Sequence, residues 1–375
     1  MRVLIVTGIW PPDVGGPASH APEVAAFLRG RGHEVEVVTT AAAAPAAEAY
    51  PVHWISRGQP VLLRYVRGAL LVGRVARGSD VVYSTGMYGR TFVGGLLAHV
   101  PRVVKLTGDP AYERAVRYGL TRLDIGDFER SRDLRVSWLK AMRNVTLWGA
   151  ARYACPSRSL RDFAARWRLV RPDRIAVVPN PISVPDPGDR DELRRRHGFH
   201  GPTLVYAGRL VLQKSLDVAL RAVARCEGVT LVLAGDGPVR AGLESLVGEL
   251  GLHERARFLG PQPRERVFEL LAAADAELLS SGWENFPHSV VEGLAVGTPV
   301  IATGVGGVRE IVTDGVNGLL VPPHDPEALA GAVRRFFADE ALRDRLRAAA
   351  PVSVDDYAPE RVYTLIEQLL EEAAA

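Results

Sequence analysis

The sequence is poor in cysteine and has no long apolar run. Only Cys155 and Cys226 are cysteines among 375 residues, which argues against a disulfide framework and against a structural zinc site. No apolar stretch reaches the roughly 18 residues that a bilayer-spanning helix needs. Apolar residues make up 47% and charged residues 24% of the chain, which excludes a disordered protein. These features predict a globular chain that is long enough for two domains.

Lysine is also scarce: the chain holds only Lys105, Lys140 and Lys214, and arginine supplies the remaining positive charge. The charge is unevenly distributed, because residues 1–185 carry a net charge of +12 and the rest a net charge of −9, within a total of +3. A basic half joined to an acidic half predicts an anionic partner for the first half only.

Within the basic half, residues 114–171 interleave many arginines with Trp138, Trp148 and Trp167. This pattern is typical of a surface that meets anionic lipid, or of solvated helix faces with the tryptophans in the core. No nucleic-acid-binding motif accompanies the charge, so we expect no nucleic acid partner. Residues 2–7 open the chain as a strand without the pattern of a secretory signal. We therefore expect a cytoplasmic protein, peripheral on the inner face of the cell membrane if the basic half binds lipid.

Strand and helix patterns alternate along both halves. Strands are expected at residues 3–7, 34–40, 81–84, 103–106, 203–207, 230–234, 256–259, 276–279, 299–302 and 319–321, with helices between them. Continuous β-branched runs separated by helices are typical of parallel sheets that are covered on both faces. The sequence therefore predicts an α/β fold with two doubly wound, Rossmann-like domains.

A proline-rich segment separates the two halves. Residues 179–188 contain four prolines, which neither the interior of a helix nor a central strand tolerates. We expect a first domain at residues 1–185, a second at 186–357 and a closing helix within 358–375. Ligands of open α/β sheets bind beyond the C-terminal ends of the strands. The arrangement predicts a ligand cleft between the two domains.

The most informative segment carries two glutamates on either side of a short loop. Glu284 follows the expected strand 276–279, and Glu292 lies in an apolar helical pattern that stops near Gly297 and Pro299. The start of that helix offers N–H groups and the positive end of its dipole to a phosphate. Two carboxylates beside an anion pocket suit a ligand with phosphates and hydroxyls, such as a sugar nucleotide. The alternative is a capped helix with a surface glutamate at each end.

Five segments in order carry a resemblance to a known family. They are residues 11–16, 207–210 with Lys214, 233–238, the E-x7-E spacing of 284–292, and 306–310. Over nearly its whole length the chain resembles the retaining family-4 glycosyltransferases, which have the GT-B architecture. That resemblance implies an acceptor-side N-terminal domain and a nucleotide-sugar-binding C-terminal domain facing a central cleft. It also implies that the helix in 358–375 packs back on the N-terminal domain.

The resemblance assigns roles to the polar residues of the second half. Arg209 and Lys214 resemble the cation pair that holds the diphosphate and stabilises its departure. Glu284 resembles the glutamate that contacts the donor sugar, and Glu292 the one that accepts hydrogen bonds from ribose hydroxyls. Further substrate contacts are expected at Gly208, Asn285, Phe286, Pro287, His288 and Ser289.

The loop between the two glutamates leaves some of these roles open. Pro287 has no N–H, so the expected backbone donors are Phe286, His288 and Ser289. The Phe286 ring is expected either against the ligand or in the core. His288 is not expected to bind a metal, because no cluster of ligand residues surrounds it at metal spacing.

Two positions in the first half are candidate site elements. Gly15 and Gly16 precede an expected helix at residues 18–29, where glycines let the backbone approach a ligand closely, although such a pair is also common in turns. After strand 103–106 the chain has Asp109, where many members of the family place a histidine. We expect Asp109 either to act in catalysis, on the acceptor hydroxyl or on developing positive charge, or to cap the following helix.

The resemblance implies a retaining, hexosyl- or related glycosyltransferase. It would move a sugar from a nucleoside-diphosphate sugar to a hydroxyl of a lipid-linked sugar or a small molecule, in the synthesis of cell-surface glycans, glycolipids or glycosylated metabolites. The alternative is a nucleotide-sugar epimerase that needs no acceptor, for which only Asp109 and Glu284 offer acid or base groups. The signature positions hold no Asp-x-Asp motif, and Arg209 and Lys214 serve the phosphates, so we expect no cofactor and no essential metal.

Overall fold

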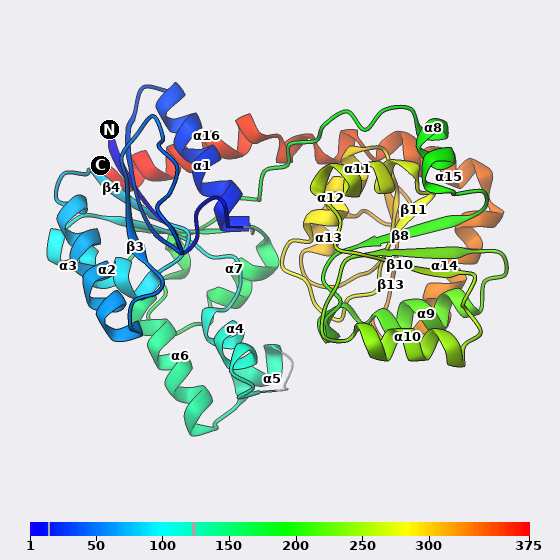
Figure 1. Ribbon diagram of the computed structural model, residues 1–375. Coiled ribbons are helices and arrows are strands. Elements are labelled where there is room, and N and C mark those ends of the chain that lie inside the picture. Colours follow the sequence, from blue (N-terminus) through cyan, green and yellow to red (C-terminus); the bar gives the residue numbers. More distant parts are fainter. Residues whose placement is uncertain (14–15, 122–124) are drawn as a thin grey trace. The chain divides into compact units, whose positions relative to one another are not determined.

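A computed structural model describes residues 1–13, 16–121 and 125–375 of the chain. The chain divides into two compact units (Figure 1). Unit 1 comprises Met1–Val178 and Val362–Ala375, and unit 2 comprises Pro179–Arg361. The division therefore falls at the start of the proline-rich segment, a few residues before the expected boundary after residue 185. The C-terminal segment belongs to unit 1.

Unit 1 is built on a parallel sheet with the strand order β3-β2-β1-β4-β5-β6-β7. The strands are β1 (Arg2–Val6), β2 (Glu34–Ala41), β3 (Val52–Ser56), β4 (Val81–Ser84), β5 (Arg102–Lys105), β6 (Arg152–Cys155) and β7 (Ile175–Val177). The order reverses direction between β1 and β4, which is the switch point of a doubly wound sheet.

Helices cover both faces of this sheet because successive strand residues point to opposite sides. Val3 and Ile5 pack with Leu28 of α1 (Gly16–Gly30) and with Ile366 of α16 (Pro359–Ala374). On the other face, Leu4 and Val6 pack with α2 (Val61–Ala76), which lies beside α3 (Tyr88–Ala98). The remaining elements are α4 (Pro110–Arg117), α5 (Ile125–Arg130), α6 (Leu134–Leu147), α7 (Arg158–Ala164) and the 3-10 turn η1 (Pro172–Arg174).

Unit 2 repeats this plan with the strand order β10-β9-β8-β11-β12-β13, again parallel throughout the named strands. The strands are β8 (Thr203–Ala207), β9 (Thr230–Ala234), β10 (Ala256–Gly260), β11 (Ala276–Leu279), β12 (Val300–Thr303) and β13 (Gly318–Val321). The order reverses between β8 and β11, so the loops after these two strands diverge and leave room for a ligand.

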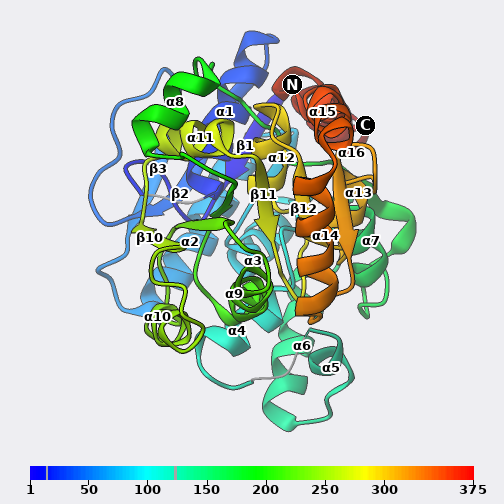
Figure 2. The ribbon, with the colours of Figure 1, turned by 90° about the vertical axis from the view of Figure 1, so that its right-hand side faces the viewer.

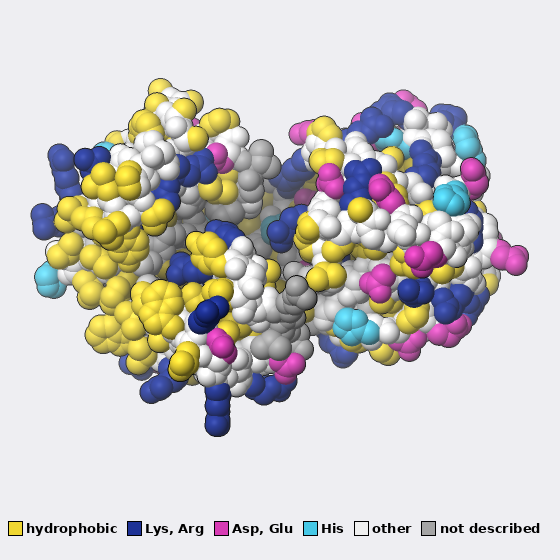
Figure 3. Space-filling model, turned by 60° about the horizontal axis from the view of Figure 1, so that its bottom comes forward, with side chains coloured by type: hydrophobic (Ala, Val, Ile, Leu, Met, Phe, Trp, Pro, Cys, Tyr) yellow, Lys and Arg dark blue, Asp and Glu magenta, His cyan; other side chains and the backbone are white. Residues whose placement is uncertain are grey.

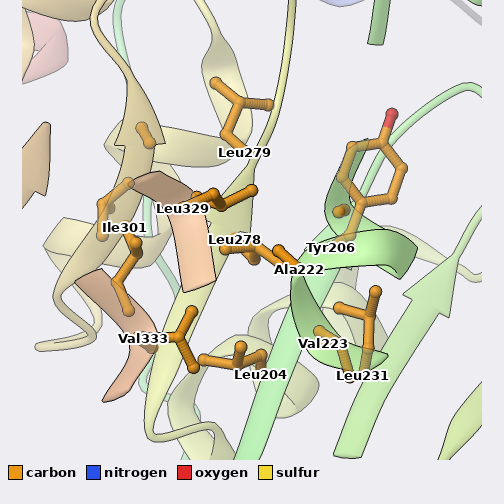
Figure 4. Packing of buried hydrophobic residues seen from close by; sticks show 14 of the residues in the cluster. Leu204, Tyr206, Ala222, Val223, Leu231, Leu278, Leu279, Ile301, Leu329 and Val333 are labelled. Carbon is orange, nitrogen blue, oxygen red and sulfur yellow. The ribbon is translucent and has the colours of Figure 1, made fainter. Parts of the chain in front are cut away.

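Two groups of helices enclose the sheet of unit 2. One group is α8 (Arg190–His197), α11 (Arg264–Ala273) and α12 (His288–Ala295); the other is α9 (Leu216–Ala224), α10 (Arg240–Glu249) and α14 (Pro326–Ala338). Figures 1 and 2 show α8, α11 and α12 together on one side, away from α9 and α10. Figure 4 shows the core between the sheet and the second group, where Leu204 and Leu231 meet Val223 of α9 and Val333 of α14. The remaining elements are η2 (Leu212–Lys214), α13 (Val308–Ile311), α15 (Glu340–Ala349) and η3 (Val352–Tyr357).

The predicted α/β class and doubly wound architecture are confirmed in each unit. The sequence pattern did not predict β3, β6 and β7 in unit 1. Each of these strands is only three to five residues long. β3 and β7 also lie at the edges of the sheet, where a strand does not need the continuous apolar sequence of a central strand. The large apolar residue Trp54 of β3 is 37% exposed. Apolar residues in this strand therefore do not mark the buried positions, as they do in a half-buried strand.

Candidate functional site

A pocket of about 370 Å³ lies in unit 2, beyond the C-terminal ends of β8 and β11. These strands flank the switch point of the sheet, which is where open α/β sheets bind ligands. The pocket is lined by Ala207, Gly208, Arg209, Gln213, Lys214, Val267, Glu284, Pro287, His288, Ser289 and Glu292. The structure thus brings together eight residues that the sequence predicted as parts of one site: Gly208, Arg209, Lys214, Glu284, Pro287, His288, Ser289 and Glu292.

The loops around the pocket approach one another so closely that glycine is required. A Cβ on Gly235 would lie 1.8 Å from the carbonyl oxygen of Gly208, and Gly235 has φ +151°. A Cβ on Gly306 would lie 1.9 Å from the carbonyl oxygen of Glu284, which also accepts a hydrogen bond of 3.1 Å from the Gly307 N–H. Two segments of the resemblance, 233–238 and 306–310, therefore fix the backbone behind Gly208 and Glu284.

Lys214 and Glu284, both in the pocket lining, form an ion pair. Their side chains are 16% and 6% exposed, and the Ser281 hydroxyl donates a hydrogen bond of 2.6 Å to the same carboxylate of Glu284. The cation expected to hold the diphosphate therefore contacts the carboxylate expected to hold the sugar. Removal of either residue would leave the other charge poorly solvated.

Hydrogen bonds between loops set the position of this pair. The Ser280 hydroxyl donates to the Lys214 carbonyl over 2.9 Å, and the Gln213 side-chain amide donates to the Trp283 carbonyl over 2.7 Å. The Gly282 N–H donates back to the Gln213 carbonyl over 2.9 Å. These contacts tie the loop after β8 to the loop after β11, so Lys214 and Glu284 are held before any ligand arrives.

Two further groups add positive charge to the pocket. Arg209 is exposed and forms no ion pair with any residue in the described ranges, so its guanidinium is available to a phosphate. Helix α12 begins after Pro287, whose side chain makes no capping hydrogen bond, and Ser289 in its first turn lines the pocket. The positive end of the helix dipole thus faces the same space.

Glu292 lies on α12 with its side chain 15% exposed, 3.7 Å from the guanidinium of Arg264 on α11. Burial raises the pKa of Glu292, and the charge of Arg264 opposes that rise. A carboxylate in this position can accept hydrogen bonds from a pair of hydroxyls while Arg264 stabilises its charge.

The residues between the two glutamates take different positions. The Phe286 ring is buried in the core, edge-on to Tyr357 at 5.4 Å between ring centroids, and it is not part of the pocket lining. Of the two positions expected for the Phe286 ring, the core position is therefore the one observed. A role for the Phe286 backbone N–H in ligand binding stays a prediction. Asn285 is half-buried outside the lining residues. His288 is exposed, and its ring nitrogen lies 3.1 Å from the amide of Asn180.

The candidates of the first half lie in unit 1. Asp109 caps α4, because its carboxylate accepts a hydrogen bond of 2.8 Å from the Ala111 N–H. The same carboxylate is buried and pairs with Arg143 over 2.7 Å; burial raises the pKa of Asp109, and the Arg143 charge opposes that rise. The cap is thus what the structure shows, and a catalytic role for Asp109 stays a prediction. Gly16 is the exposed first residue of α1, and Gly15 lies outside the described residues.

Sequence reasoning missed several residues of the site. Gln213 and Val267 line the pocket, and Ser281 holds Glu284, but none of these residue types stands out in a sequence. Glu277 could have been noticed, because it is an acidic residue inside the otherwise apolar strand β11, where it is fully buried. Buried carboxylates are rare without a partner, so an acid in a central strand is a signal in its own right.

Two doubly wound units, with a pocket lined by cations and carboxylates at the switch point of the second, have the architecture of the GT-B glycosyltransferases. Two family models match consecutive parts of the chain: Glycosyltransferase Family 4 over residues 14–186, and Glycosyl transferases group 1 over residues 189–352. The chain belongs to this family of glycosyltransferases.

Relatives and solved structures agree with this assignment. The chain is 27% identical over 368 residues to an uncharacterized glycosyltransferase of Methanocaldococcus jannaschii, covering 92% of this chain and 91% of that protein. It is also 38% identical over 193 residues to a D-inositol 3-phosphate glycosyltransferase of Xylanimonas cellulosilytica. That match covers 48% of this chain and 46% of the relative. The structure of Anabaena HepE in complex with UDP has the same fold, with a TM-score of 0.79, 21% identity, and coverage of 99% of this chain and 100% of that one.

Proposed function

We propose that the protein is a retaining glycosyltransferase that uses a nucleoside-diphosphate sugar as donor. The observation that carries this proposal is the composition of one pocket: two cations, Arg209 and Lys214, and two carboxylates, Glu284 and Glu292, around the start of α12. Cations and a helix N-terminus suit a diphosphate, and carboxylates suit sugar hydroxyls. HepE, which shares the fold, is described as a complex with UDP, and this supports a donor of the same chemical kind.

In the proposed reaction, the bond between the sugar C1 and the diphosphate oxygen breaks, and a bond between C1 and the acceptor oxygen forms on the same face. The electron pair of the broken bond stays with the diphosphate, which then takes the proton of the acceptor hydroxyl. Arg209, Lys214 and the first turn of α12 stabilise the charge that builds on the leaving group. Glu284, already fixed by Lys214 and Ser281, would orient the sugar hydroxyls as the ring flattens.

The test is an activity screen with UDP-, GDP- and ADP-sugars. Each donor is incubated with the protein alone and with hydroxyl acceptors, both lipid-linked sugars and small molecules. We expect transfer to an acceptor, with product of the same anomeric configuration as the donor by NMR. Epimerised donor in the absence of any acceptor would establish the epimerase alternative, and product of inverted configuration would rule out the retaining reaction.

The reaction is expected to need no divalent metal. Arg209 and Lys214 supply positive charge at the place where a Mg²⁺ ion would otherwise neutralise the diphosphate. Activity in the same screen should therefore be unchanged by EDTA. If EDTA abolishes transfer and added Mg²⁺ or Mn²⁺ restores it, the two cations are not sufficient for the leaving group.

For the acceptor, we propose a lipid-linked sugar reached from an anionic membrane surface. Apolar side chains of unit 1 are unusually exposed: Leu62 is 76% and Val66 47% exposed on α2, and Trp138 is 61% exposed on α6. Figure 3 shows a broad hydrophobic area with basic side chains around it on the side of unit 1 turned toward the viewer. Trp167, in contrast, is buried beneath Arg143 and takes no part in this surface. Among the described residues, no helix has the length and hydrophobicity of a transmembrane span.

The full-length protein is therefore expected to co-sediment with liposomes that contain anionic lipid and to be released by salt, because screening shortens the attraction to about a Debye length. Leu62→Ser combined with Val66→Ser should weaken binding several-fold. Val316→Ser, at a residue of unit 2 that is 50% exposed, is the matched control and should not. Equal binding to neutral and anionic liposomes at low salt would leave a soluble small molecule as the better acceptor.

A further inference from the structure

Glu277 is an acid at the centre of the sheet of unit 2. It is 0% exposed, and its strand neighbours in register are Val205 of β8 and Val300 of β12. Its carboxyl group points toward α12, because a Cβ on Gly293 would lie 2.7 Å from the Glu277 Oε2 atom. Glycine at position 293 thus leaves the room that this carboxyl group occupies between the sheet and the helix.

The carboxyl group of Glu277 lies against α12 about one helical turn from the pocket, because the lining residue Ser289 precedes Gly293 by four positions on the same helix face. Neither of its oxygens has a hydrogen-bond partner among the described residues. Ser289 lines the pocket from the first turn of α12. The buried acid therefore packs against the helix whose first turn faces the space proposed for the diphosphate.

Burial favours the neutral form of Glu277. Burial raises the pKa of Glu277 to about 8; Glu292 on α12 and Glu284 in the adjoining loop raise it as well, while Ser289 and Lys214 oppose the rise. Tyr206 of β8 points to the opposite face of the sheet, because Val205 is the residue in register with Glu277; burial raises the pKa of Tyr206 above its usual value, so it stays neutral. Glu284 and Glu292 already bring two negative charges to a pocket that is to hold an anion, and an ionised Glu277 would add a third.

We propose that Glu277 acts on donor binding from its buried position against α12: in its neutral form it leaves the pocket without a third negative charge. This proposal rests on the proposed donor site. An ionised Glu277 could accept a hydrogen bond from the Ser289 hydroxyl, which lowers its pKa, but its charge would repel a diphosphate in the pocket. A nucleoside diphosphate should therefore bind the form of the protein in which Glu277 is protonated.

The experiment measures the affinity for UDP, GDP, ADP and inorganic pyrophosphate by calorimetry between pH 7 and pH 9. For the wild-type protein, the affinity for the nucleotide that binds most tightly should fall about ten-fold over this range, because the competent fraction falls as Glu277 ionises. Glu277→Gln keeps the shape and a hydrogen-bond donor but cannot ionise, so its affinity should fall much less. Pyrophosphate lacks the nucleoside. If Glu277 acts on the diphosphate, the affinity for pyrophosphate should also fall more steeply with pH in the wild type than in Glu277→Gln.

A measurement on the unaltered protein covers the case in which the variant does not fold. If binding selects protonated Glu277, wild-type protein should take up about half a proton when it binds nucleotide at pH 8, as calorimetry in buffers of different ionisation enthalpy reports. Proton release or no net exchange would overturn the proposal, as would the same ten-fold fall in wild type and Glu277→Gln. Failure of all four ligands to bind at pH 7 would instead contradict the donor site itself.

Discussion

Lys214→Ala is expected to reduce both stability and donor binding. The Glu284 side chain is 6% exposed and loses the cation that pairs with it. Breaking this pair should destabilise the fold by about 3 kcal/mol. This is the lower end of the range for buried pairs, because Lys214 is itself partly exposed. Turnover at subsaturating donor should fall by about two to three orders of magnitude, because a cation aimed at the leaving diphosphate is lost. Urea denaturation and initial rates measure the two effects separately.

Two controls separate the structural loss from the functional one. Lys214→Met combined with Glu284→Gln removes the pair without leaving a buried charge, so it should recover most of the stability and none of the activity. Arg209→Ala removes an exposed cation that has no partner in the described ranges, so its stability should stay within about 0.5 kcal/mol of wild type while donor affinity falls. Near wild-type turnover of both Lys214→Ala and Arg209→Ala would remove the diphosphate assignment.

Glu284→Ala and Glu292→Ala are expected to change different kinetic constants. A ribose contact is about equally strong in the ground state and the transition state, so Glu292→Ala should mainly raise the KM for donor. Glu284 is fixed by Lys214 and Ser281 before the ligand binds, and its partner, the sugar, changes shape and charge during reaction. Glu284→Ala should therefore lower kcat, by about two to three orders of magnitude. The opposite pattern in steady-state kinetics would mean that the two glutamates have exchanged roles.

The strands of unit 2 were predictable because each is a mostly apolar run between turn residues. All six strands named in the described residues begin and end within one residue of their expected bounds. The polar residues after β8 and β11 were predictable as one site, since the C-terminal ends of parallel strands share an edge of the sheet. Their pairing was not: the contact between Lys214 and Glu284 depends on how two loops fold together, which no local pattern encodes.

Unit 1 shows a second limit of sequence reasoning. The arginines of residues 114–171 look alike in the sequence, yet Arg143 is buried, pairs with Asp109 and Glu129, and stands 4.3 Å over the ring of Trp167. Whether an arginine is solvated or buried depends on the carboxylates that the fold brings to it. For the same reason the cap and the ion pair of Asp109 could not be distinguished from a catalytic position before the structure was known.

The membership of α16 in unit 1 affects the order in which the protein can fold during synthesis. From Val362 onward this helix packs against β1 and α1, yet the ribosome makes it after the whole of unit 2. Unit 2 is one continuous segment and can complete its core as it emerges. Unit 1 must wait, with the apolar face of Val3 and Ile5 only partly covered, for Ile366 and Leu370 to arrive. During that interval the nascent chain exposes a surface that chaperones recognise.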